Sequence, residues 1–339
     1  MKLRGAISGF GEVAAKAHLA GWRTRDNVSI GVIHDPIAER RHEAIRLIKN
    51  VRVYDDLELM LDGEALDFVD IASPPALHAA AARAALEAGA HVLVEKPLCL
   101  SLPELDQLAA LAAARGKVLM CVHNWKYAPS YALARSLVDE GRIGDVLSIS
   151  FDRLRVAPAG AGGAGGVWRS SSGSGGGILI DHGWHVFYLM QWLMGGEAAA
   201  RVAATMTLNS GGIEEVAQIQ VSFASGRNAS AILSWRATER KTSATLVGAS
   251  GRLQVENERV VLNTADGKIR EFPVHDLPDD SYHSAWFSGM AAQFEAGITD
   301  GTGGSIANAN LIEARNALSV IAAARTSAKN QGAPADIAS

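Results

Sequence analysis

The chain has 339 residues, of which 48% are hydrophobic and 20% are charged, and its formal net charge is −4. This length exceeds what one compact core usually holds, so two domains are expected. The small net charge, without a run of like charges, gives no reason to expect nucleic acid or an acidic membrane surface as a partner.

Cysteine usage and the first residues bear on the compartment. Cys99 and Cys121 are too far apart in the sequence to indicate a disulfide framework or a zinc knuckle, so we interpret both as buried, reduced thiols. Glycines and Glu12 break the apolar stretch near the N-terminus, which is not typical of a signal peptide. No stretch of about 18 residues is free of charge, so no membrane span is expected. We therefore expect a cytoplasmic protein.

The first third of the chain alternates short apolar runs with segments that have helical periodicity. The expected strands are "LRGAISG", "VSIGVIHD", "LDFVDIAS", "AHVLVEKP" and "KVLMCVH". The expected helices cover residues 12–22, 36–49, 75–89 and 101–116. Strands that alternate with helices predict a parallel sheet covered on both faces. We assign residues 1–122 to this α/β nucleotide-binding domain.

The pattern changes after residue 122. A helix over 128–141 is followed by alternating segments separated by turn residues, which predict an antiparallel sheet of about six to eight strands. Helices return near 281–297 and 305–328, and the tail from residue 330 is expected to fray. Residues 123–339 are thus expected to form an α+β domain with a large, mostly antiparallel, open sheet. Because its helices are too few to cover both faces, we expect dimers or tetramers to form through this sheet.

One glycine- and serine-rich stretch, residues 157–177, interrupts this second domain. Such a composition is typical of a flexible surface loop. A loop that closes over a ligand is the alternative, because the stretch contains "VWR" and leads directly into Asp181 and His185. The sequence leaves both interpretations open.

The segment "SGFGEVA" carries a nucleotide-binding pattern. Gly9, Gly11 and Ala14 have the G-x-G-x-x-A spacing, after an expected strand and at the start of an expected helix. The first glycine permits a tight turn, the second lets the backbone approach a pyrophosphate, and a small third residue lets helix and strand pack closely. The N–H groups at the helix N-terminus would face the phosphates.

Asp35 ends the second expected strand, where an acidic residue accepts hydrogen bonds from an adenosine ribose and repels a 2′-phosphate. This favours NAD as the cofactor. Arg40 and Arg41 leave NADP open, although both lie about a helical turn beyond Asp35.

Two further segments carry candidate chemistry. Lys96 precedes Pro97 in "LVEKP", at the carboxyl end of a parallel strand, where ligand crevices form. Asp181 and His185 are four residues apart in the apolar stretch "GGGILIDHGWHVFYLMQW", so a helix there would place both on one face. The carboxylate could then orient the imidazole and raise its pKa. No metal is expected, because no third ligand at metal spacing is evident.

Four segments, taken in order, resemble the Gfo/Idh/MocA family, the group of glucose–fructose oxidoreductase and inositol dehydrogenase. They are "GFGEVAAKAH", "SPPALHAAAARAALEAGAHVLVEKPLCLS", "HNWKYAPSY" and "SGGGILIDHGWH". The combination of E-K-P with D-x-x-x-H is far more specific than the glycine pattern. The resemblance covers nearly the whole chain and implies an N-terminal Rossmann domain followed by a sheet domain.

The resemblance also implies roles for individual residues. Lys96 matches a lysine that contacts substrate and cofactor, His185 a histidine that exchanges the hydroxyl proton, and Asp181 its acidic companion. The cofactor-binding residues so expected are Gly9, Phe10, Gly11, Glu12, Val13, Asp35, Ser73, Pro74, His78, Glu95, Lys96 and Asn124. The expected substrate-binding residues are Lys96, Asn124, Lys126, Trp168, Arg169, Asp181 and His185.

The sequence departs from the family pattern at three places. Lys126 replaces the usual arginine, which disfavours a bidentate grip on a carboxylate or phosphate. Pro75 stands where asparagine is common. The glycine-rich insertion before Asp181 is unusual and weakens any inference of substrate from relatives.

The expected activity is hydride transfer between the nicotinamide and a secondary alcohol of a sugar, cyclitol or related polyol. Lys96 and His185 would assist the proton transfer. Two alternatives stay open: an NAD-dependent glycoside-cleaving enzyme of the same family, and a non-catalytic NAD-binding regulator. The sequence does not identify the substrate, the reacting hydroxyl or the physiological direction.

Overall fold

The computed structural model describes residues 2–159, 168–171, 175–276, 282–299 and 303–337. The chain divides into two compact units. Unit 1 consists of Met1–Tyr127 and Asp279–Ala314, and unit 2 of Ala128–Pro278 and Arg315–Ser339. The sequence analysis placed one boundary between residues 122 and 123. The structure instead groups a late segment of the chain with the N-terminal unit.

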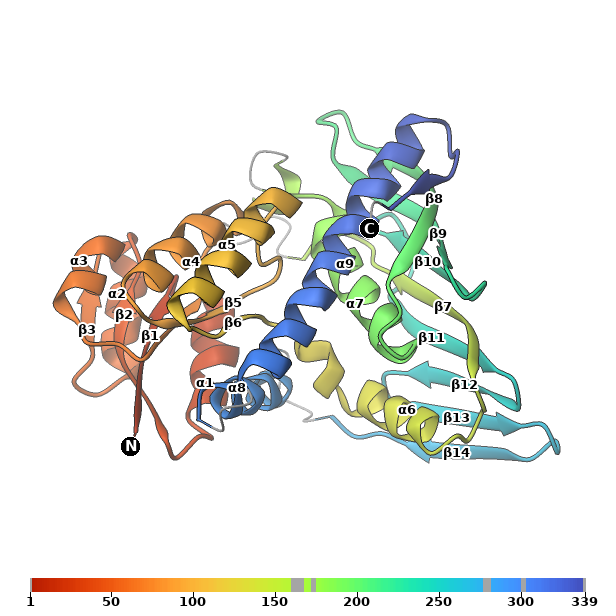
Figure 1. Ribbon diagram of the computed structural model, residues 1–339, viewed down its shortest axis with the longest axis horizontal. Coiled ribbons are helices and arrows are strands. Elements are labelled where there is room, and N and C mark those ends of the chain that lie inside the picture. The colour runs from red at the N-terminus through yellow and green to blue at the C-terminus, as the bar shows by residue number, and fades with distance from the viewer. Residues whose placement is uncertain (1, 160–167, 172–174, 277–281, 300–302, 338–339) are drawn as a thin grey trace. The chain divides into compact units, whose positions relative to one another are not determined.

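Unit 1 contains a six-stranded sheet in which every pairing is parallel, in the order β3-β2-β1-β4-β5-β6 (Figure 1). This is the predicted Rossmann arrangement, in which the strand order reverses beside the first strand. The strands are β1 (Leu3–Ser8), β2 (Val28–His34), β3 (Arg52–Tyr54), β4 (Phe68–Ile71), β5 (His91–Val94) and β6 (Leu119–Cys121).

Helices connect these strands as the alternating pattern predicted. Residues 12–22 are helical throughout, with a π-helical segment η1 (Ala14–His18) before α1 (Leu19–Trp22). The other helical segments of unit 1 before residue 128 are α2 (Ala38–Leu47), α3 (Leu57–Gly63), η2 (Pro75–Leu77), α4 (His78–Glu87), α5 (Leu102–Arg115) and η3 (Asn124–Tyr127).

The sequence analysis missed β3 and α3. The three residues of β3 are exposed or half-buried at the edge of the sheet, so they lack the apolar run by which the other strands were found. An edge strand needs only one neighbour, and β2 supplies it.

Helix α8 (Ser284–Thr299) explains why the late segment belongs to unit 1. Its residues Phe287, Met290 and Phe294 lie in the same buried cluster as residues of β1, α1 and β4. Trp22 contacts both phenylalanine rings edge-on, at centroid distances of 5.7 and 6.2 Å. The core of unit 1 is therefore closed by side chains that the chain supplies about 280 residues after β1.

Unit 2 contains a nine-stranded sheet in the order β14-β13-β12-β11-β7-β10-β9-β8-β15 (Figure 1). All pairings are antiparallel except that between β7 and β10. The strands are β7 (Val146–Leu154), β8 (Ala199–Leu208), β9 (Glu214–Phe223), β10 (Asn228–Ser234), β11 (Lys241–Gly248), β12 (Gly251–Glu256), β13 (Arg259–Thr264), β14 (Ile269–Pro273) and β15 (Ala335–Asp336).

The last strand corrects an expectation about the tail. Residues 335 and 336 were expected to fray, but they pair with Val202 and Arg201 of β8. An ion pair of 2.7 Å between Arg201 and Asp336 adds to the two residues of ladder. A two-residue strand carries too little pattern to be recognised from sequence.

The helices of unit 2 lie over one face of this sheet (Figure 1). They are α6 (Pro129–Asp139), η6 (Leu179–Gly183), α7 (Trp184–Leu193) and the part of α9 (Gly303–Lys329) from Arg315 onward. Nine of the ten residues of α7 are buried, which is typical of a core helix rather than a surface helix. The apolar stretch around Asp181 is thus explained by its burial within unit 2.

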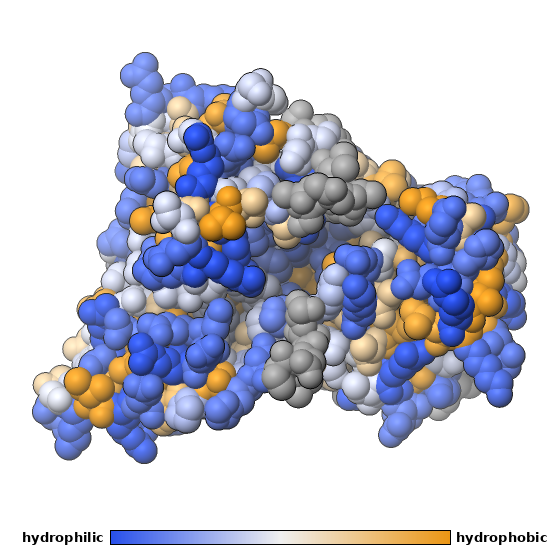
Figure 2. Space-filling view, turned by 180° about the vertical axis from the view of Figure 1, so that it is seen from behind, coloured by the Kyte–Doolittle hydropathy of each residue, from blue (hydrophilic) through white to orange (hydrophobic). Residues whose placement is uncertain are grey.

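Hydrophobic side chains on the face shown in Figure 2 appear in small groups among hydrophilic ones. None of the helices that the structure describes is long and apolar enough to cross a membrane.

Candidate active site

The glycine-rich turn after β1 is built as the nucleotide-binding pattern requires. Gly9 has a φ of +90°, and a Cβ atom there would lie 2.5 Å from the backbone nitrogen of Ser73. Both the backbone conformation and the close approach therefore require glycine. Among the described residues, a Cβ on Gly11 would meet only the Arg40 guanidinium carbon, at 4.0 Å, so none of them takes the space beside Gly11. That space fits a phosphate group approaching the backbone.

Asp35 lies directly beside this turn. Its carboxylate accepts hydrogen bonds from the backbone N–H groups of Phe10, at 2.7 Å, and Ile37, at 2.9 Å. Arg40 pairs with the same carboxylate at 3.3 Å. The Asp35 side chain is 1% exposed, whereas that of Arg40 is 33% exposed. The accessible charge at this corner is therefore the guanidinium, a feature that the sequence analysis did not anticipate.

The other predicted residues of the turn differ in accessibility. Phe10 is fully buried, so only its backbone can take part in binding. Val13 is exposed, and Glu12 pairs with Lys16 at 3.2 Å and accepts a hydrogen bond from Tyr282 at 2.9 Å. Ala14, the small third residue of the pattern, is buried.

Lys96 follows β5 at its carboxyl end, as expected, and its peptide bond to Pro97 is cis. The side chain of Glu95 accepts a hydrogen bond from the Lys96 backbone N–H at 2.9 Å and contacts Nε2 of His18 at 3.1 Å. Nδ1 of His18 lies 2.9 Å from Asp70, which also accepts a 2.7 Å hydrogen bond from Trp22. A buried chain of polar contacts therefore leads from Asp70 to the backbone of Lys96.

The pKa values of two groups in this series of polar contacts, His18 and Glu95, are shifted from their usual values. Burial by itself lowers the pKa of His18, but the charges and hydrogen bonds of Asp70 and Glu95 outweigh it and raise this pKa to about 9. Burial by itself raises the pKa of Glu95, but the hydrogen bond and charge of His18 lower it below its usual value. His18 is thus held as an imidazolium between two carboxylates.

His78 joins two of the predicted cofactor-binding loops. Its ring nitrogens lie 2.7 Å from the carbonyl oxygen of Ser73 and 2.6 Å from that of Pro97. Pro74 is exposed and Ser73 is half-buried beside Gly9. His78 is itself buried, and burial lowers its pKa. Its role in this structure is to hold the Ser73 and Lys96 loops together rather than to present a free imidazole.

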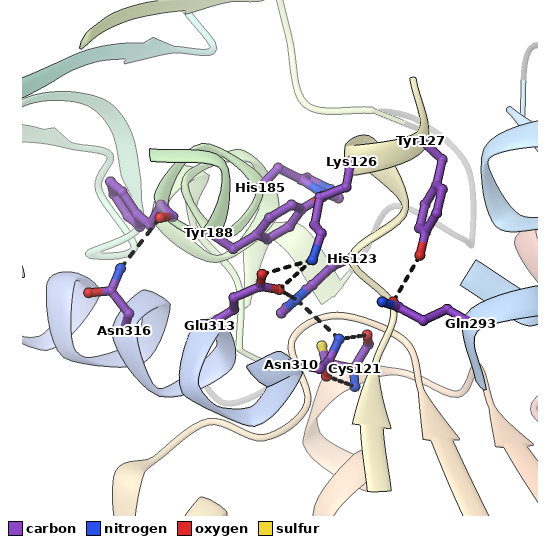
Figure 3. A network of polar contacts seen from close by, with 11 residues as sticks. Cys121, His123, Lys126, Tyr127, His185, Tyr188, Gln293, Asn310, Glu313 and Asn316 are labelled. Atoms are coloured by element: carbon purple, nitrogen blue, oxygen red, sulfur yellow. Dashed lines mark hydrogen bonds and ion pairs between the residues drawn. The ribbon is translucent and has the colours of Figure 1, made fainter. Parts of the chain in front are cut away.

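Asn124 and Lys126 lie on η3, directly after β6, and Lys126 belongs to a network that the sequence did not reveal (Figure 3). Its ammonium group lies 2.8 and 3.1 Å from the two carboxylate oxygens of Glu313. The same carboxylate lies 2.9 Å from Nδ1 of His123, and Asn310 bonds both backbone groups of Cys121. Glu313 neutralises the lysine that replaces the family's arginine. No signal marks this glutamate within its helix.

Unit 2 contains the second predicted group. Asp181 pairs with Arg169 at 3.1 Å and lies 3.6 Å from Nε2 of His182. The Arg169 guanidinium also lies over the Trp168 ring, 4.5 Å from its centroid. Asp181 falls in the π-helical η6, whose wider turn changes which side chains are stacked. His182, the residue next to Asp181, lies on this wider turn as well, and the expected role of Asp181 beside His185 stays a prediction.

His185 lies in α7 and contacts another residue of the same helix. Its Nδ1 lies 3.1 Å from the hydroxyl of Tyr188, one turn later, and both residues are buried. Trp184, directly before His185, is fully buried in the core of unit 2. Tyr188 was not predicted, although its i+3 spacing from His185 was visible in the sequence.

The glycine-rich stretch is described only in part, since residues 160–167 and 172–174 lie outside the described residues. Two of its glycines have clear structural reasons. A Cβ on Gly176 would lie 2.4 Å from the carbonyl oxygen of Arg169. Gly177 has a φ of +107°, and its Cβ would overlap the Glu214 carboxylate. Close packing before Asp181 therefore requires both glycines.

The predicted residues thus fall into two groups. Unit 1 contains the glycine turn, Asp35, the Ser73 loop, Lys96 and η3. Unit 2 brings together Arg169, Asp181 and His185. Within the described part of the chain, no group of three or more His, Cys, Asp or Glu side chains is arranged to hold a metal ion.

Comparison with models of known families shows which family the chain belongs to. Residues 3–123 match the "Oxidoreductase family, NAD-binding Rossmann fold" profile of Gfo/Idh/MocA, and residues 131–254 match the "GFO/IDH/MocA C-terminal domain". The chain belongs to the Gfo/Idh/MocA family. It is therefore a member of an NAD-binding oxidoreductase family, and the resemblance stated from its motifs is confirmed.

Curated relatives in this family include sugar dehydrogenases. The chain is 31% identical to D-glucoside 3-dehydrogenase of Escherichia coli over 60% of its own length and 57% of that protein. It is 27% identical to D-apiose dehydrogenase of Paraburkholderia graminis over 78% and 71% of the two chains.

A solved structure of an inositol dehydrogenase homologue from Azotobacter vinelandii, with NADH and myo-inositol, matches with a TM-score of 0.85. That match has 19% identity and covers 99% of this chain and 98% of the other. At this identity it shows the shared fold alone.

Proposed function

We propose that the protein is an NAD-dependent dehydrogenase that oxidises a secondary alcohol of a sugar, cyclitol or related polyol. The observation that carries the proposal is the linkage in unit 1 between the glycine turn and the E-K-P lysine. A Cβ added to Gly9 would lie 2.5 Å from the Ser73 backbone nitrogen, so the two loops approach closely. His78 links the Ser73 loop to Pro97, next to Lys96. A lysine held so closely to a nucleotide-binding turn suits work on the nicotinamide end of a bound dinucleotide.

The cofactor would be held by this chain's own backbone and side chains. The open space at Gly11 fits the pyrophosphate, and the helix that begins at residue 12 directs N–H groups toward it. The Arg40 guanidinium, which covers the buried Asp35 carboxylate, would face the adenosine ribose. When bound, the nicotinamide supplies the hydride acceptor, which no amino-acid side chain provides.

Lys96 would act on the substrate as a cation. An ammonium group that donates a hydrogen bond to the reacting hydroxyl lowers the pKa of that hydroxyl and stabilises the alkoxide that develops. The backbone of Lys96 is fixed by Glu95, whose carboxylate is fixed in turn by His18.

His185 would accept the hydroxyl proton. Its Nδ1 lies 3.1 Å from the Tyr188 hydroxyl, and Nε2 is the nitrogen that we assign to take up the proton. For Nε2 to be the acceptor, Nδ1 must carry the hydrogen and donate it to Tyr188. Asp181, paired with Arg169, would support the turn that precedes His185.

The experiment is a search for NADH or NADPH formation at 340 nm across inositols, aldoses, glycosides, sugar acids and amino sugars, with both oxidised cofactors. A substrate found in this way is then used with Lys96→Met and His185→Ala. Each variant is expected to lose about 100-fold or more of kcat. Both are expected to retain NAD binding in calorimetry, with Arg252→Met on β12 as a control of unchanged activity.

Two outcomes would contradict the proposal. Cofactor binding without reduction by any compound of the panel would favour a non-catalytic regulator. Release of an aglycone from a glycoside without accumulation of NADH would favour the glycoside-cleaving alternative.

A further inference from the structure

Unit 1 contains a cavity at the amino ends of β5 and β6, beside α5, α8 and the first turns of α9 (Figure 1). Its volume is about 420 Å3, which lies in the range typical of small-molecule sites. Gly116 and Asn308 line the cavity and are exposed, so a ligand can enter it from solvent.

The cavity is separate from the candidate active site. The glycine turn and Lys96 follow the carboxyl ends of their strands, where the ligand crevices of such sheets form. His91, which lines the cavity, begins β5, and Lys96 follows the other end of the same strand. At the rise of an extended chain, the backbones of these two residues are about 16 Å apart. A ligand in the cavity therefore does not take the place assigned to the cofactor.

Much of the wall of the cavity is apolar and comes from four elements. Its apolar side chains include Ala112 of α5, Leu119 of β6, Ile298 of α8 and Leu311 of α9. Ala109 lines the cavity as well, and its single methyl group leaves room that a larger side chain would fill. Carbon atoms of a ligand would be removed from water against this wall, which favours binding. The ligand is thus expected to have an apolar body.

Three polar side chains line the same cavity, those of Lys117, His91 and Asn308. Lys117 is half-buried, and no carboxylate pairs with it within the described part of the chain. The amide of Asn308 likewise makes no hydrogen bond to a residue that the structure describes. Of the described residues that line the cavity, none is an aspartate or a glutamate. The cavity therefore carries a positive charge without a counter-charge of its own.

His91 adds a neutral hydrogen-bond donor to this wall. Its Nδ1 accepts a hydrogen bond from the backbone N–H of Val118 at 2.9 Å, so the ring hydrogen is on Nε2. Burial, followed by the charge of Lys117, lowers the pKa of His91 to about 4, so the imidazole is neutral at pH 7. Asp67 opposes this shift, and its carboxylate accepts a hydrogen bond from the Arg4 backbone at 2.7 Å.

We propose that this cavity binds a small organic carboxylate. The Lys117 ammonium group would supply the counter-charge, and Nε2–H of His91 and the Asn308 amide would donate hydrogen bonds to the carboxylate oxygens. The apolar wall would hold the rest of the ligand. A carboxylate suits the site better than inorganic phosphate, because the cavity offers one cation and a largely apolar surface. The inference is independent of the proposed function.

The test uses calorimetry on the full chain at pH 7.5 with three probes. They are 4-methylpentanoate, its neutral amide 4-methylpentanamide, and inorganic phosphate. The acid is expected to bind with a Kd of about 1 mM or lower, which a ligand of this size can reach. The amide and phosphate are each expected to bind about tenfold or more weakly, since the amide lacks the charge and phosphate lacks the apolar body.

Variants then locate the binding. Lys117→Met is expected to reduce the affinity for the acid to that for the amide, and Lys117→Arg to retain most of it. Ala109→Phe fills the cavity without changing a charge, so it should abolish binding of both organic probes. Lys49→Met, an exposed lysine after α2, is the matched control and should bind the acid as the wild-type protein does. Circular dichroism confirms that each variant is folded.

Several results would overturn the proposal. They are the absence of binding of the acid to the wild-type protein, equal affinities for the acid and the amide, and a higher affinity for phosphate. Binding of the acid that survives both Lys117→Met and Ala109→Phe would place the carboxylate elsewhere on the molecule. Loss of binding in these two variants, with the Lys49→Met protein unaffected, would support the site.

Discussion

The imidazole of His18 lies 3.1 Å from the carboxylate of Glu95, whose other oxygen accepts a hydrogen bond from the backbone of Lys96. Phe287 stacks on the same imidazole at a centroid distance of 3.9 Å. A charged histidine is thus enclosed in the core of unit 1, between two carboxylates and beneath an aromatic ring. The loop that carries Lys96 depends on this ion group for its position.

The stability of the protein should depend on pH through His18. Its pKa is raised in the folded state to about 9, against an ordinary value of 6.5. The stabilisation is therefore complete below pH 6.5 and is lost as the pH rises from 6.5 through 9. The amount is on the order of 3 kcal/mol. Denaturant unfolding at pH 6, 7.5 and 9, with His18→Asn for comparison, measures it, and parallel pH profiles of the two proteins would contradict the assignment.

Gly11→Ala should separate nucleotide binding from folding. Because the Arg40 guanidinium carbon is the one atom of the described residues within 4 Å of the added Cβ, the free energy of unfolding should change by about 1 kcal/mol or less. The methyl group would occupy the space assigned to the pyrophosphate, so the Kd for NAD should rise about tenfold or more. Gly31→Ala in β2, where nothing lies within 4 Å, is the matched control. Unchanged NAD affinity in Gly11→Ala would show that the phosphates bind elsewhere.

Arg40 should control the choice between NAD and NADP. Because its guanidinium covers the buried Asp35 carboxylate, it presents positive charge where a 2′-phosphate would lie. Arg40→Ala is expected to lower kcat/KM with NADP about tenfold while kcat/KM with NAD stays nearly constant. Arg46, in the last turn of α2, serves as the control for a lost surface charge. An unchanged ratio of the two cofactors would rule out this role.

Tyr188→Phe should impair proton transfer without loss of substrate binding. The Tyr188 hydroxyl engages Nδ1 of His185, and its removal frees the imidazole to adopt the other tautomer. We expect kcat to fall about tenfold with KM little changed, and the pH profile of kcat to shift. Tyr54→Phe, at the edge of unit 1, controls for the loss of a hydroxyl. A lower affinity for substrate with normal kcat would instead indicate a binding role.

Association through the large sheet stays a prediction that one residue can test. Leu147 in β7 and Val247 in β11 are 48% and 40% exposed on neighbouring strands. Leu147→Asp is expected to shift a dimer or tetramer toward the monomer in light scattering at micromolar concentration. Val156→Asp, which lies just beyond β7 and is more exposed, should have no such effect. If the wild-type protein is a monomer at this concentration, the prediction is wrong.

Five of the six strands of unit 1 could be predicted because each of them is a continuous apolar run, whereas β3 lacks such a run. The nucleotide turn could be predicted because Gly9 and Gly11 follow the first of these runs. Asp35 was found for the same reason, at the end of β2. Its pairing with Arg40 was not found, since a rotamer of a long side chain leaves no mark in the spacing of residues. Contacts between residues far apart in the sequence could not be predicted either. The ion pair between Lys126 and Glu313 is the clearest example.

The Asp181 region shows a second limit on what the sequence can predict. The spacing of four residues assumed a regular α-helix, whereas Leu179–Gly183 is π-helical. The expectation that Asp181 orients His185 was argued from that assumption and stays a prediction, and the sequence offers no sign of the wider turn. Tyr188 was visible as a residue, but only the fold reveals that its hydroxyl contacts His185.

The discontinuous makeup of unit 1 has a consequence for how the protein is synthesised. Phe287, Met290 and Phe294 belong to its core, yet they are translated after every strand of unit 2 except β15. A nascent chain that has released only residues 1–127 therefore exposes the apolar surface around Trp22 and Phe68 that α8 later covers. The nucleotide-binding unit therefore completes its folding only after α8 has been translated, and not when its last sheet strand, β6, leaves the ribosome.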